Sequence, residues 1–354
     1  MRPLRKLLSI AAVSTALLYV MASRTAIGQT DDLGCDLHAS SLQRLYAHLG
    51  SDEHPDLKGI VILCDGQRVS ETYFNGDTAE SLHDIRSATK SITATLMGIA
   101  VQRGLVHSLN DSIAVYLPGL PHDGKQKITI RDLLTMRSGL AANDDDPLSP
   151  GNEDNLDKAS DWLKAAYAIP MKEQPGHTYV YCSLNAFLTG VIVSNAAKMP
   201  LDNFARKNLF SPLAISRFDW LKAAGGQTKG QGNLSIRTRD LAAIGQMYLN
   251  HGVLQSRRIL NPEWIEQSWA KQVQISSSDP YADFYGFMWY SRDEPTSTSP
   301  TPVHFASGNG GNKIYVVPSR HLVIAITSSA YGHGYGQRRS QAILFSILSN
   351  TNIL

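Results

Sequence analysis

The chain has 354 residues, of which 43% are hydrophobic and 18% charged, enough apolar sequence for one large packed domain or two smaller ones. A formal net charge of +2 is too small to indicate a nucleic acid or an anionic membrane surface as a partner. Three cysteines are too few for a disulfide framework, although a single bridge between Cys35 and Cys64 is left open.

Residues 1–28 have the pattern of a secretory signal peptide. Basic residues precede an apolar run from Leu7 to Ala22, and small residues follow before Gln29. We therefore predict cleavage between Ala22 and Gln29, and export of residues 29–354 to the periplasm or the medium, without a membrane span. A retained N-terminal anchor is the less favoured alternative, because the apolar run is short for a spanning helix.

A short helix and a β-hairpin are the first elements predicted in the mature chain. The helix is expected over residues 42–49, and the two strands over Gly59–Cys64 and Arg68–Phe74. Asp65 and Gly66 lie between the strands and are typical of a tight hairpin turn.

An amphipathic helix is predicted from Ser87 to Arg103, with Gly104 ending it. Its fourth residue, Lys90, is unusual because the positively polarised N-terminus of a helix disfavours a cation. The same field lowers the pKa of an ammonium group, and a lysine of lowered pKa one turn from a serine hydroxyl is what a Ser-Lys nucleophile requires. An ordinary helix cap with a solvated lysine explains these four residues equally well.

Helical patterns dominate the middle of the chain. A long surface loop, residues 143–157, interrupts them, and we interpret its acidic side chains as a solvated face rather than a metal site. The helices are expected over residues 128–136, 160–169, 185–197, 201–209 and 239–250.

Several common chemistries are excluded by their missing motifs. The segment Gly119–Lys125 resembles a phosphate-binding loop, but Gln126 stands where Ser or Thr would have to hold Mg²⁺. There is no HExxH or paired CxxC motif for zinc, and no Gly-x-Ser-x-Gly nucleophile elbow. We therefore predict neither a metal nor an organic cofactor.

The C-terminal part returns to β-structure before a last helix at 336–349. Strands are expected over His304–Ser307, Lys313–Val317 and Leu322–Thr327. Strands at both chain ends with helices between them indicate an α+β fold, in which both ends form one sheet and an all-α insertion covers it. We place the α/β part at about residues 36–110 and 235–354, and the helical part at about 111–234.

Two further motifs follow Ser87-x-x-Lys90 along the chain. Tyr181-Cys182-Ser183 precedes a helix, and Ala306-Ser307-Gly308 opens onto a strand. With these motifs the chain resembles the class C β-lactamase superfamily of penicillin-recognising serine hydrolases, which also contains DD-peptidases, esterases and 6-aminohexanoate-dimer hydrolases. Residues 133–140 (LLTMRSGL) and 238–242 (TRDLA) resemble two more family segments, so the resemblance runs from about Gly59 to the C-terminus.

The resemblance implies a β-lactamase/transpeptidase-like fold and an acyl-serine mechanism. Ser87 would be the nucleophile, and Lys90 and Tyr181 would share the work of the base. An unperturbed phenol has a pKa of about 10, so Tyr181 needs a cation close by to act near neutral pH. Taken alone, Tyr181 would be interpreted as a buried aromatic of a helical region.

The resemblance also implies which residues bind the substrate. The oxyanion would lie between the backbone N–H groups of Ser87 and Asn309, and losing one such donor typically costs about 10²–10³ in rate. Ser183, Ser307 and Gly308 occupy the other positions at which the family contacts its substrates.

Two departures from the family pattern bear on the substrate. Ser183 stands where the family has an asparagine, and Ala306 stands where it has a lysine or histidine. His304 is on the same strand face as Ala306 and is a candidate for the missing cation, although a plain surface histidine is favoured. Both losses argue against an efficient β-lactamase. The aromatic segment 284–290 fits a cleft lining and a buried core equally well.

The sequence thus predicts an exported serine hydrolase that cleaves a carboxylic ester, a small amide or a short peptide. The alternatives are a β-lactamase or D-amino-peptide hydrolase and, from another class, a catalytically silent binding or sensor protein on the same fold. The acyl group, the leaving group and the oligomeric state are left open.

Overall fold

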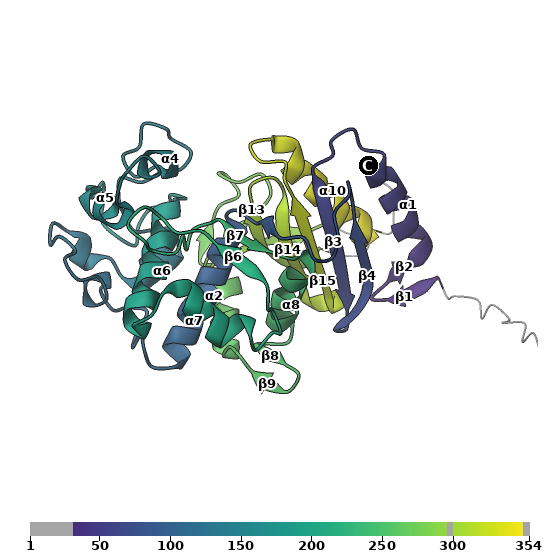
Figure 1. Cartoon of the computed structure of the whole chain (residues 1–354), viewed down its shortest axis with the longest axis horizontal. Coiled ribbons are helices and arrows are strands. Elements are labelled where there is room, and N and C mark those ends of the chain that lie inside the picture. The colour runs from purple at the N-terminus through teal and green to yellow at the C-terminus, as the bar shows by residue number, and fades with distance from the viewer. Residues whose placement is uncertain (1–30, 296–299, 350–354) are drawn as a thin grey trace, which may run out of the picture. The chain divides into compact units, whose positions relative to one another are not determined.

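An antiparallel sheet organises the fold, and both ends of the chain contribute strands to it (Figure 1). The computed structural model describes residues 31–295 and 300–349, and within them eight strands follow the order β10-β11-β12-β13-β14-β15-β3-β4. They are β3 Leu57–Cys64, β4 Gln67–Tyr73, β10 Val273–Gln274, β11 Phe284–Tyr285, β12 Tyr290–Glu294, β13 Thr301–Gly308, β14 Asn312–Val317 and β15 Leu322–Ser328. The antiparallel pairing of β15 with β3 joins the two ends, which confirms the predicted α+β fold.

The central strands are buried along their whole length because helices cover both faces of the sheet. Every residue of β14 and β15 is buried, as expected for strands without a solvent-facing side. Helix α8 (Thr238–Leu249) packs on β3, β14 and β15, and α10 (Gly334–Ser349) packs on β14 and β15 and against α1 (Ala39–Gly50). Figure 1 shows the sheet between α8 and the pair formed by α1 and α10.

The predicted β3–β4 hairpin is confirmed. Asp65 and Gly66 connect the strands, with φ values of 48° and 77°. Two consecutive residues of positive φ are typical of the tight turn whose twist matches that of the strands.

The helical part lies to the left of the sheet in Figure 1. Its longest members are α2 (Ala88–Gln102) and α6 (Ser183–Ala197), which pack against each other. The shorter helices are α3 Ile130–Leu134, α4 Glu153–Leu156, α5 Trp162–Ala168, α7 Leu201–Ala205 and α9 Pro262–Trp269, with single helical turns at Ile113–Val115, Lys125–Lys127 and Arg206–Phe210. One further turn, Pro318–Arg320, connects β14 to β15. Helix α2 begins where predicted. The prediction that only one face of this helix is buried was wrong, since all residues from Ala88 to Ala100 are buried.

Small sheets supplement these layers. The described residues include a three-stranded sheet of order β5-β7-β6, which the sequence analysis did not predict. It contains β5 His83–Asp84, β6 Phe218–Trp220 and β7 Leu234–Ile236, and two further hairpins pair β1 Asp32–Gly34 with β2 Leu37–His38 and β8 Val253–Leu254 with β9 Arg257–Arg258. Strand β5 ends three residues before Ser87, so this sheet anchors the segment that leads into α2.

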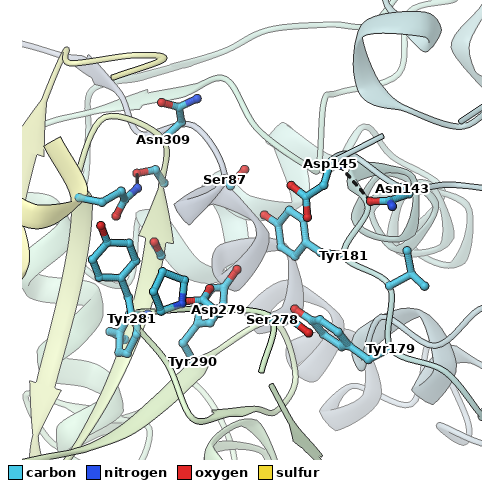
Figure 2. A pocket seen from close by; sticks show the side chains of 16 residues that line it. Ser87, Asn143, Asp145, Tyr179, Tyr181, Ser278, Asp279, Tyr281, Tyr290 and Asn309 are labelled. Atoms are coloured by element: carbon cyan, nitrogen blue, oxygen red, sulfur yellow. Dashed lines mark hydrogen bonds between the residues drawn. The ribbon is translucent and has the colours of Figure 1, made fainter. Parts of the chain in front are cut away.

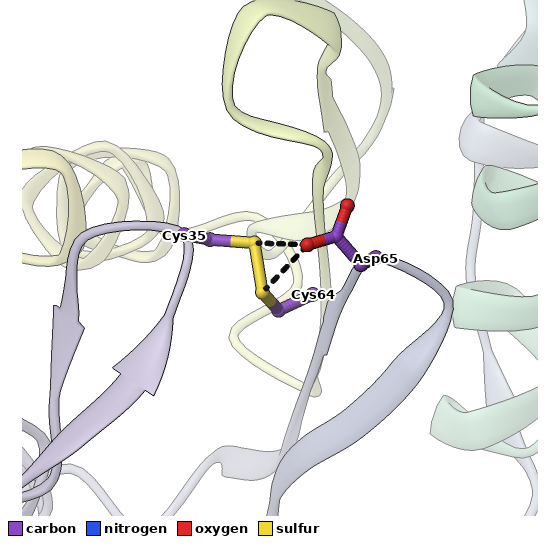
Figure 3. A group of neighbouring side chains, drawn as sticks. All are labelled: Cys35, Cys64 and Asp65. Atoms are coloured by element: carbon purple, nitrogen blue, oxygen red, sulfur yellow. Dashed lines mark hydrogen bonds between the residues drawn. A yellow bond between two sulfur atoms is a disulfide. The ribbon is translucent and has the colours of Figure 1, made fainter.

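Cys35 and Cys64 form a disulfide that joins the β1–β2 turn to the end of β3 (Figure 3). One carboxylate oxygen of Asp65 lies 4.0 Å and 3.9 Å from the two sulfur atoms. Because both sulfur atoms are already bonded to each other, neither is available as a thiolate ligand, and this cluster is not a metal site.

The described residues from Asp32 onward form one compact unit. None of the helices in residues 31–295 and 300–349 is long and apolar enough to cross a bilayer. The predicted signal peptide, residues 1–28, lies outside the described residues, and the proposed division into an α/β part and a helical part stays a prediction.

Candidate active site

Ser87 lies at the N-cap of α2, but its hydroxyl does not cap the helix. Its φ of −63° and ψ of −13° are already helical, whereas a capping serine is usually extended. Arg86, immediately before it, has a φ of 51°, a conformation that costs a non-glycine residue about 1 kcal/mol or more. The Arg86 N–H donates to Asp84 Oδ1 (2.8 Å), and its guanidinium lies 4.1 Å from the Tyr331 ring centroid. These contacts hold the turn that leaves the Ser87 hydroxyl free for chemistry.

Lys90 reaches back over one helical turn to that hydroxyl. Its Nζ donates to Ser87 Oγ at 2.8 Å and to the backbone oxygen of Gln231 at 2.9 Å. The side chain is buried, and its Nζ lies 5.1 Å from the centroid of the Tyr181 ring.

The charge state of Lys90 differs from the predicted one. Burial by itself lowers the pKa of this ammonium, but the negative charges of Tyr181, Glu153 and Asp144 outweigh burial and raise the pKa above its usual value. The prediction of a lowered pKa was therefore wrong, because the nearby negative charges outweigh the lowering effect of burial. Lys90 is held as a cation.

Tyr181 lies in the segment that leads into α6, beside the Lys90 cation. Two other tyrosines of the cleft, Tyr179 and Tyr290, have a pKa raised well above the usual value, chiefly by burial. Those two are neutral phenols at ordinary pH. Tyr181 differs from both in having the Lys90 ammonium 5.1 Å from its ring centroid, which makes it the candidate proton acceptor.

Ser183 does not line the cleft, unlike Tyr181 two residues before it. It is fully buried at the first residue of α6. Its N–H donates to Asp144 Oδ2 (2.7 Å) and its hydroxyl to Glu153 Oε2 (2.9 Å). A role in substrate contact stays a prediction for Ser183, whose partners in the structure are two carboxylates.

Those two carboxylates belong to the loop that the sequence analysis interpreted as a solvated face, and for these residues that interpretation was wrong. Asp144 and Glu153 turn inward, and burial raises the pKa of Asp144. Glu153 also accepts a hydrogen bond from Gln231 Nε2 (3.2 Å). No motif marked these three residues, because each reaches the site through the tertiary fold.

Gly308 brings strand β13 against the start of α2. A Cβ atom at this position would lie 2.0 Å from the backbone oxygen of Ile85 and 3.0 Å from the backbone nitrogen of Ala88. Only glycine permits this approach. It carries the next residue, Asn309, into the same cleft wall as Ser87.

The backbone N–H groups of Ser87 and Asn309 are suited to bind an oxyanion. Neither donates to another group in the part of the chain that the structure describes. Instead, the side chain of Asn309 is tied down, since its Oδ1 accepts from Gly332 N–H at 2.8 Å. Free amide donors held in place before the reaction are what an oxyanion hole requires.

A cleft of about 490 Å³ opens beside Ser87, a volume that suits a small molecule (Figure 2). Its lining includes Tyr179, Tyr181, Asp279, Tyr290, Ser307 and Asn309. The aromatic segment 284–290 was predicted either to line a cleft or to be buried in the core, and its residues do both. Tyr290 lines the cleft, whereas Tyr285, Phe287 and Trp289 are buried in the core.

His304 does not supply the missing cation, and it is not a plain surface residue either. Its ring stacks on Trp269 at a centroid distance of 4.3 Å and shares a 2.7 Å hydrogen bond with Ser291 Oγ. Burial lowers the pKa of His304 to about 4, which leaves the ring uncharged at neutral pH. Ser307, on the opposite face of β13, lines the cleft and accepts a hydrogen bond from Lys313.

Comparisons with known proteins bear on the family and the fold of the chain. A family model described as Beta-lactamase matches residues 56–346. A curated Escherichia coli (strain K12) protein named "Putative D-alanyl-D-alanine carboxypeptidase" is 30% identical over 151 residues, 39% of this chain and 34% of that protein. The match thus spans about a third of that relative's length.

Two solved structures illustrate the fold. The octameric penicillin-binding protein homologue from Pyrococcus abyssi has a TM-score of 0.67 and 20% identity, covering 87% of this chain and 77% of that one. The D-stereospecific amidohydrolase from Streptomyces sp. has a TM-score of 0.66 and 18% identity, covering 89% and 99%. At such identities these structures establish the fold, and the family model covers most of the sequence. The resemblance inferred from the motifs is confirmed, and the chain belongs to the Beta-lactamase family of serine hydrolases.

Proposed function

We propose that this protein hydrolyses small carboxylic esters or amides through an acyl intermediate on Ser87. The observation that carries the proposal is the 2.8 Å hydrogen bond from Lys90 Nζ to Ser87 Oγ beside the cleft. A serine hydroxyl is a weak nucleophile until a neighbouring base takes its proton, and the Lys90–Tyr181 pair provides that base.

Acylation begins at Tyr181. Its phenolate, stabilised by the Lys90 ammonium, accepts the Ser87 proton as Oγ attacks the substrate carbonyl carbon. The resulting oxyanion is bound by the backbone N–H groups of Ser87 and Asn309. Tyr181 then returns the proton to the leaving alcohol or amine as its bond to the acyl carbon breaks, and an ester of Ser87 remains.

Deacylation uses the same groups with water as the nucleophile. Tyr181 accepts a proton from the attacking water, and the second tetrahedral intermediate occupies the same amide donors. Ser87 leaves as its hydroxyl, reprotonated from Tyr181. One water is consumed, and one carboxylic acid and one alcohol or amine are released. The steps require no metal and no organic cofactor.

β-Lactam or D-amino-peptide hydrolysis is the second candidate. It is supported by the names of the similar proteins, whereas Ser183 and Ala306 depart from the pattern that accompanies penicillin recognition. Catalytic turnover of a cephalosporin would favour a β-lactamase, and stoichiometric acylation by penicillin would favour a peptidase.

The test compares the wild-type protein with Ser87→Ala on a short p-nitrophenyl ester and on a chromogenic cephalosporin. We expect ester turnover to fall by about 10³-fold or more in the variant, because no other group can carry the acyl chain. Little cephalosporin turnover is expected from either protein. Ester hydrolysis that survives in Ser87→Ala would contradict the assignment of the nucleophile, and a wild-type protein inactive on both substrates would favour a silent binding protein.

We further propose that the protein is exported after removal of residues 1–28. The Cys35–Cys64 disulfide supports this, because such bonds persist in oxidising compartments. N-terminal sequencing of protein from the periplasm or medium tests it, with a mature terminus between Ala22 and Gln29 as the expected result. An intact Met1 on the protein in the membrane fraction would instead indicate a retained anchor.

A further inference from the structure

A buried lysine, Lys313, lies directly behind the substrate cleft. It is paired with Ser307 in the register of β13 and β14, so both side chains are on one face of the sheet. Lys313 Nζ donates to Ser307 Oγ at 2.7 Å, and Ser307 lines the cleft whereas Lys313, 1% exposed, does not. The serine therefore stands between the lysine and any bound substrate.

Lys313 is unusual because it makes no ion pair with any residue in 31–295 or 300–349. Aromatic rings surround it instead, with Nζ at 4.9 Å from the Phe305 centroid, 5.8 Å from Tyr315 and 5.9 Å from Tyr281. Ring faces at such distances attract a cation, but they do not neutralise it. A buried charge without a counter-ion is destabilising, so its presence beside a cleft points to a ligand.

The buried lysine Lys125 provides the contrast. It is 2% exposed, and its Nζ lies 2.7 Å from Asp123 Oδ2. Lys125 therefore has its counter-charge within the protein, as a buried lysine normally does. Among the described residues no carboxylate lies within ion-pair distance of Lys313, and Asp279 acts on it only from farther away. A ligand in the cleft could supply the closer anion.

We propose that Lys313 is a specificity-determining positioning residue that acts through Ser307 to bind a carboxylate of the substrate. This inference rests on the proposed hydrolase function at Ser87. Because the Lys313 ammonium donates to Ser307 Oγ, the Ser307 hydroxyl cannot donate its own proton back to Lys313. That O–H group is therefore available to donate to an acceptor in the cleft. A substrate carboxylate accepts that O–H and supplies the missing negative charge.

In this proposal Lys313 takes the place of the basic residue that the family pattern has at position 306, but it approaches from strand β14. Ala306, where the family pattern has a basic residue, is fully buried and pairs with Ile314. Side chains alternate along a strand, so Phe305 and Ser307 face the side opposite to Ala306. Lys313 reaches this second side from the neighbouring strand.

The pKa of Lys313 supports a pH-dependent preference. Burial lowers this pKa to about 7, and the charge of Asp279 acts in the opposite direction. Of the other groups around it, Tyr315 is neutral because burial raises its pKa well above the usual value, and Tyr281, Ser307 and the α10 side chain Gln337 carry no positive charge. The cation is therefore present below about pH 7 and lost above it.

The experiment uses two acetate esters that differ only in the leaving group, 4-nitrophenol or 3-carboxy-4-nitrophenol. Both form the same acetyl-Ser87, so the ratio of their kcat/KM values reports the contribution of the carboxylate to acylation. We expect the wild-type protein to favour the carboxylated ester, and Lys313→Met to lower the ratio by about tenfold or more. Hydrolysis of the neutral ester should change by less than about threefold. Lys125→Met is the matched control and should leave the ratio unaltered.

A second measurement needs no variant, so it decides the matter even if Lys313→Met does not fold. In the wild-type protein the ratio should fall as the pH rises from about 6 to about 9, following loss of the Lys313 proton. A ratio that is independent of pH, or equal in Lys313→Met and wild type, would overturn the proposal while ester hydrolysis through Ser87 stands. Turnover that persists in Ser87→Ala would instead remove the proposed function on which it rests.

Discussion

The charge on Lys90 decides which residue can act as the base. A neutral lysine would take the Ser87 proton itself, whereas an ammonium leaves that task to Tyr181. Burial favours the neutral form, but the charges of Tyr181, Glu153 and Asp144 raise the pKa of Lys90 overall. In the proposed mechanism, Glu153 and Asp144 therefore affect the choice of base by raising the pKa of Lys90.

Glu153→Gln should move the alkaline limb of the kcat/KM profile to lower pH by about half a unit to one unit. The substitution removes a negative charge that raises the pKa of Lys90, so the ammonium is lost at lower pH. Gln keeps an oxygen that can accept from Ser183, which limits structural change. The measurement is kcat/KM for a neutral p-nitrophenyl ester across the pH range.

Asp154→Asn is the matched control, because Asp154 is the exposed neighbour of Glu153 on the same short helix. It removes one carboxylate from α4 and should leave the profile unchanged. Equal shifts in both variants would mean that general surface charge, rather than the buried contact, sets the alkaline limb.

At the scale of elements, the approach of β13 to the start of α2 shapes the site. The two elements bring the Ser87 and Asn309 amides to one cleft wall, and Gly308 is where they touch. Gln337 Nε2 on α10 also donates to the Gly308 oxygen at 2.8 Å, so a third element holds this strand end in place. The proposed oxyanion site thus combines segments more than 200 residues apart in the sequence.

Gly308→Ala should lower both stability and activity. The added Cβ would meet the Ile85 oxygen at 2.0 Å, and overpacking of this kind typically costs about 1–3 kcal/mol. Displacement of Asn309 from the oxyanion should reduce kcat by about tenfold or more. Urea unfolding and ester kinetics measure the two effects. Gly50→Ala at the end of α1, where no atom lies within 4 Å, should change neither beyond about 0.5 kcal/mol.

At the scale of the whole molecule, the sheet combines strands from both ends of the chain. The disulfide links the β1–β2 turn to β3, the first strand of that sheet in the sequence. Cys35 and Cys64 are 29 residues apart in the sequence, and none of the described residues before Ser87 lines the cleft. The disulfide is therefore expected to contribute to stability and not to catalysis.

Replacing both cysteines by serine should lower the free energy of unfolding by about 3.5 kcal/mol, the stabilisation expected from closing a loop of this length. The kcat of the folded variant should equal that of the wild-type protein. Thiol titration in denaturant provides the check on the starting material, with Cys182 as the single free thiol expected. Three titrating thiols, or an unfolding free energy that does not change, would show that the bond is not formed in the protein as isolated.

Local pattern was sufficient for much of the fold. The hairpin around Asp65-Gly66, the start of α2 and the three C-terminal strands each follow from turn chemistry or apolar periodicity within a short window. The very short strands β5, β6 and β7 could not be found in this way, because their pairing is between distant segments.

The sequence by itself determined the family and the identity of the candidate nucleophile and base. Ser87, Lys90 and Tyr181 belong to short motifs that can be recognised in the amino-acid sequence. Tertiary structure alone decided the charge of Lys90, the inward turn of Asp144 and Glu153, and the position of Lys313 behind Ser307. The physical reason is the range of the interactions involved. A motif records neighbours along the chain, whereas a pKa depends on burial and on every charge nearby in space, whichever element brings it there.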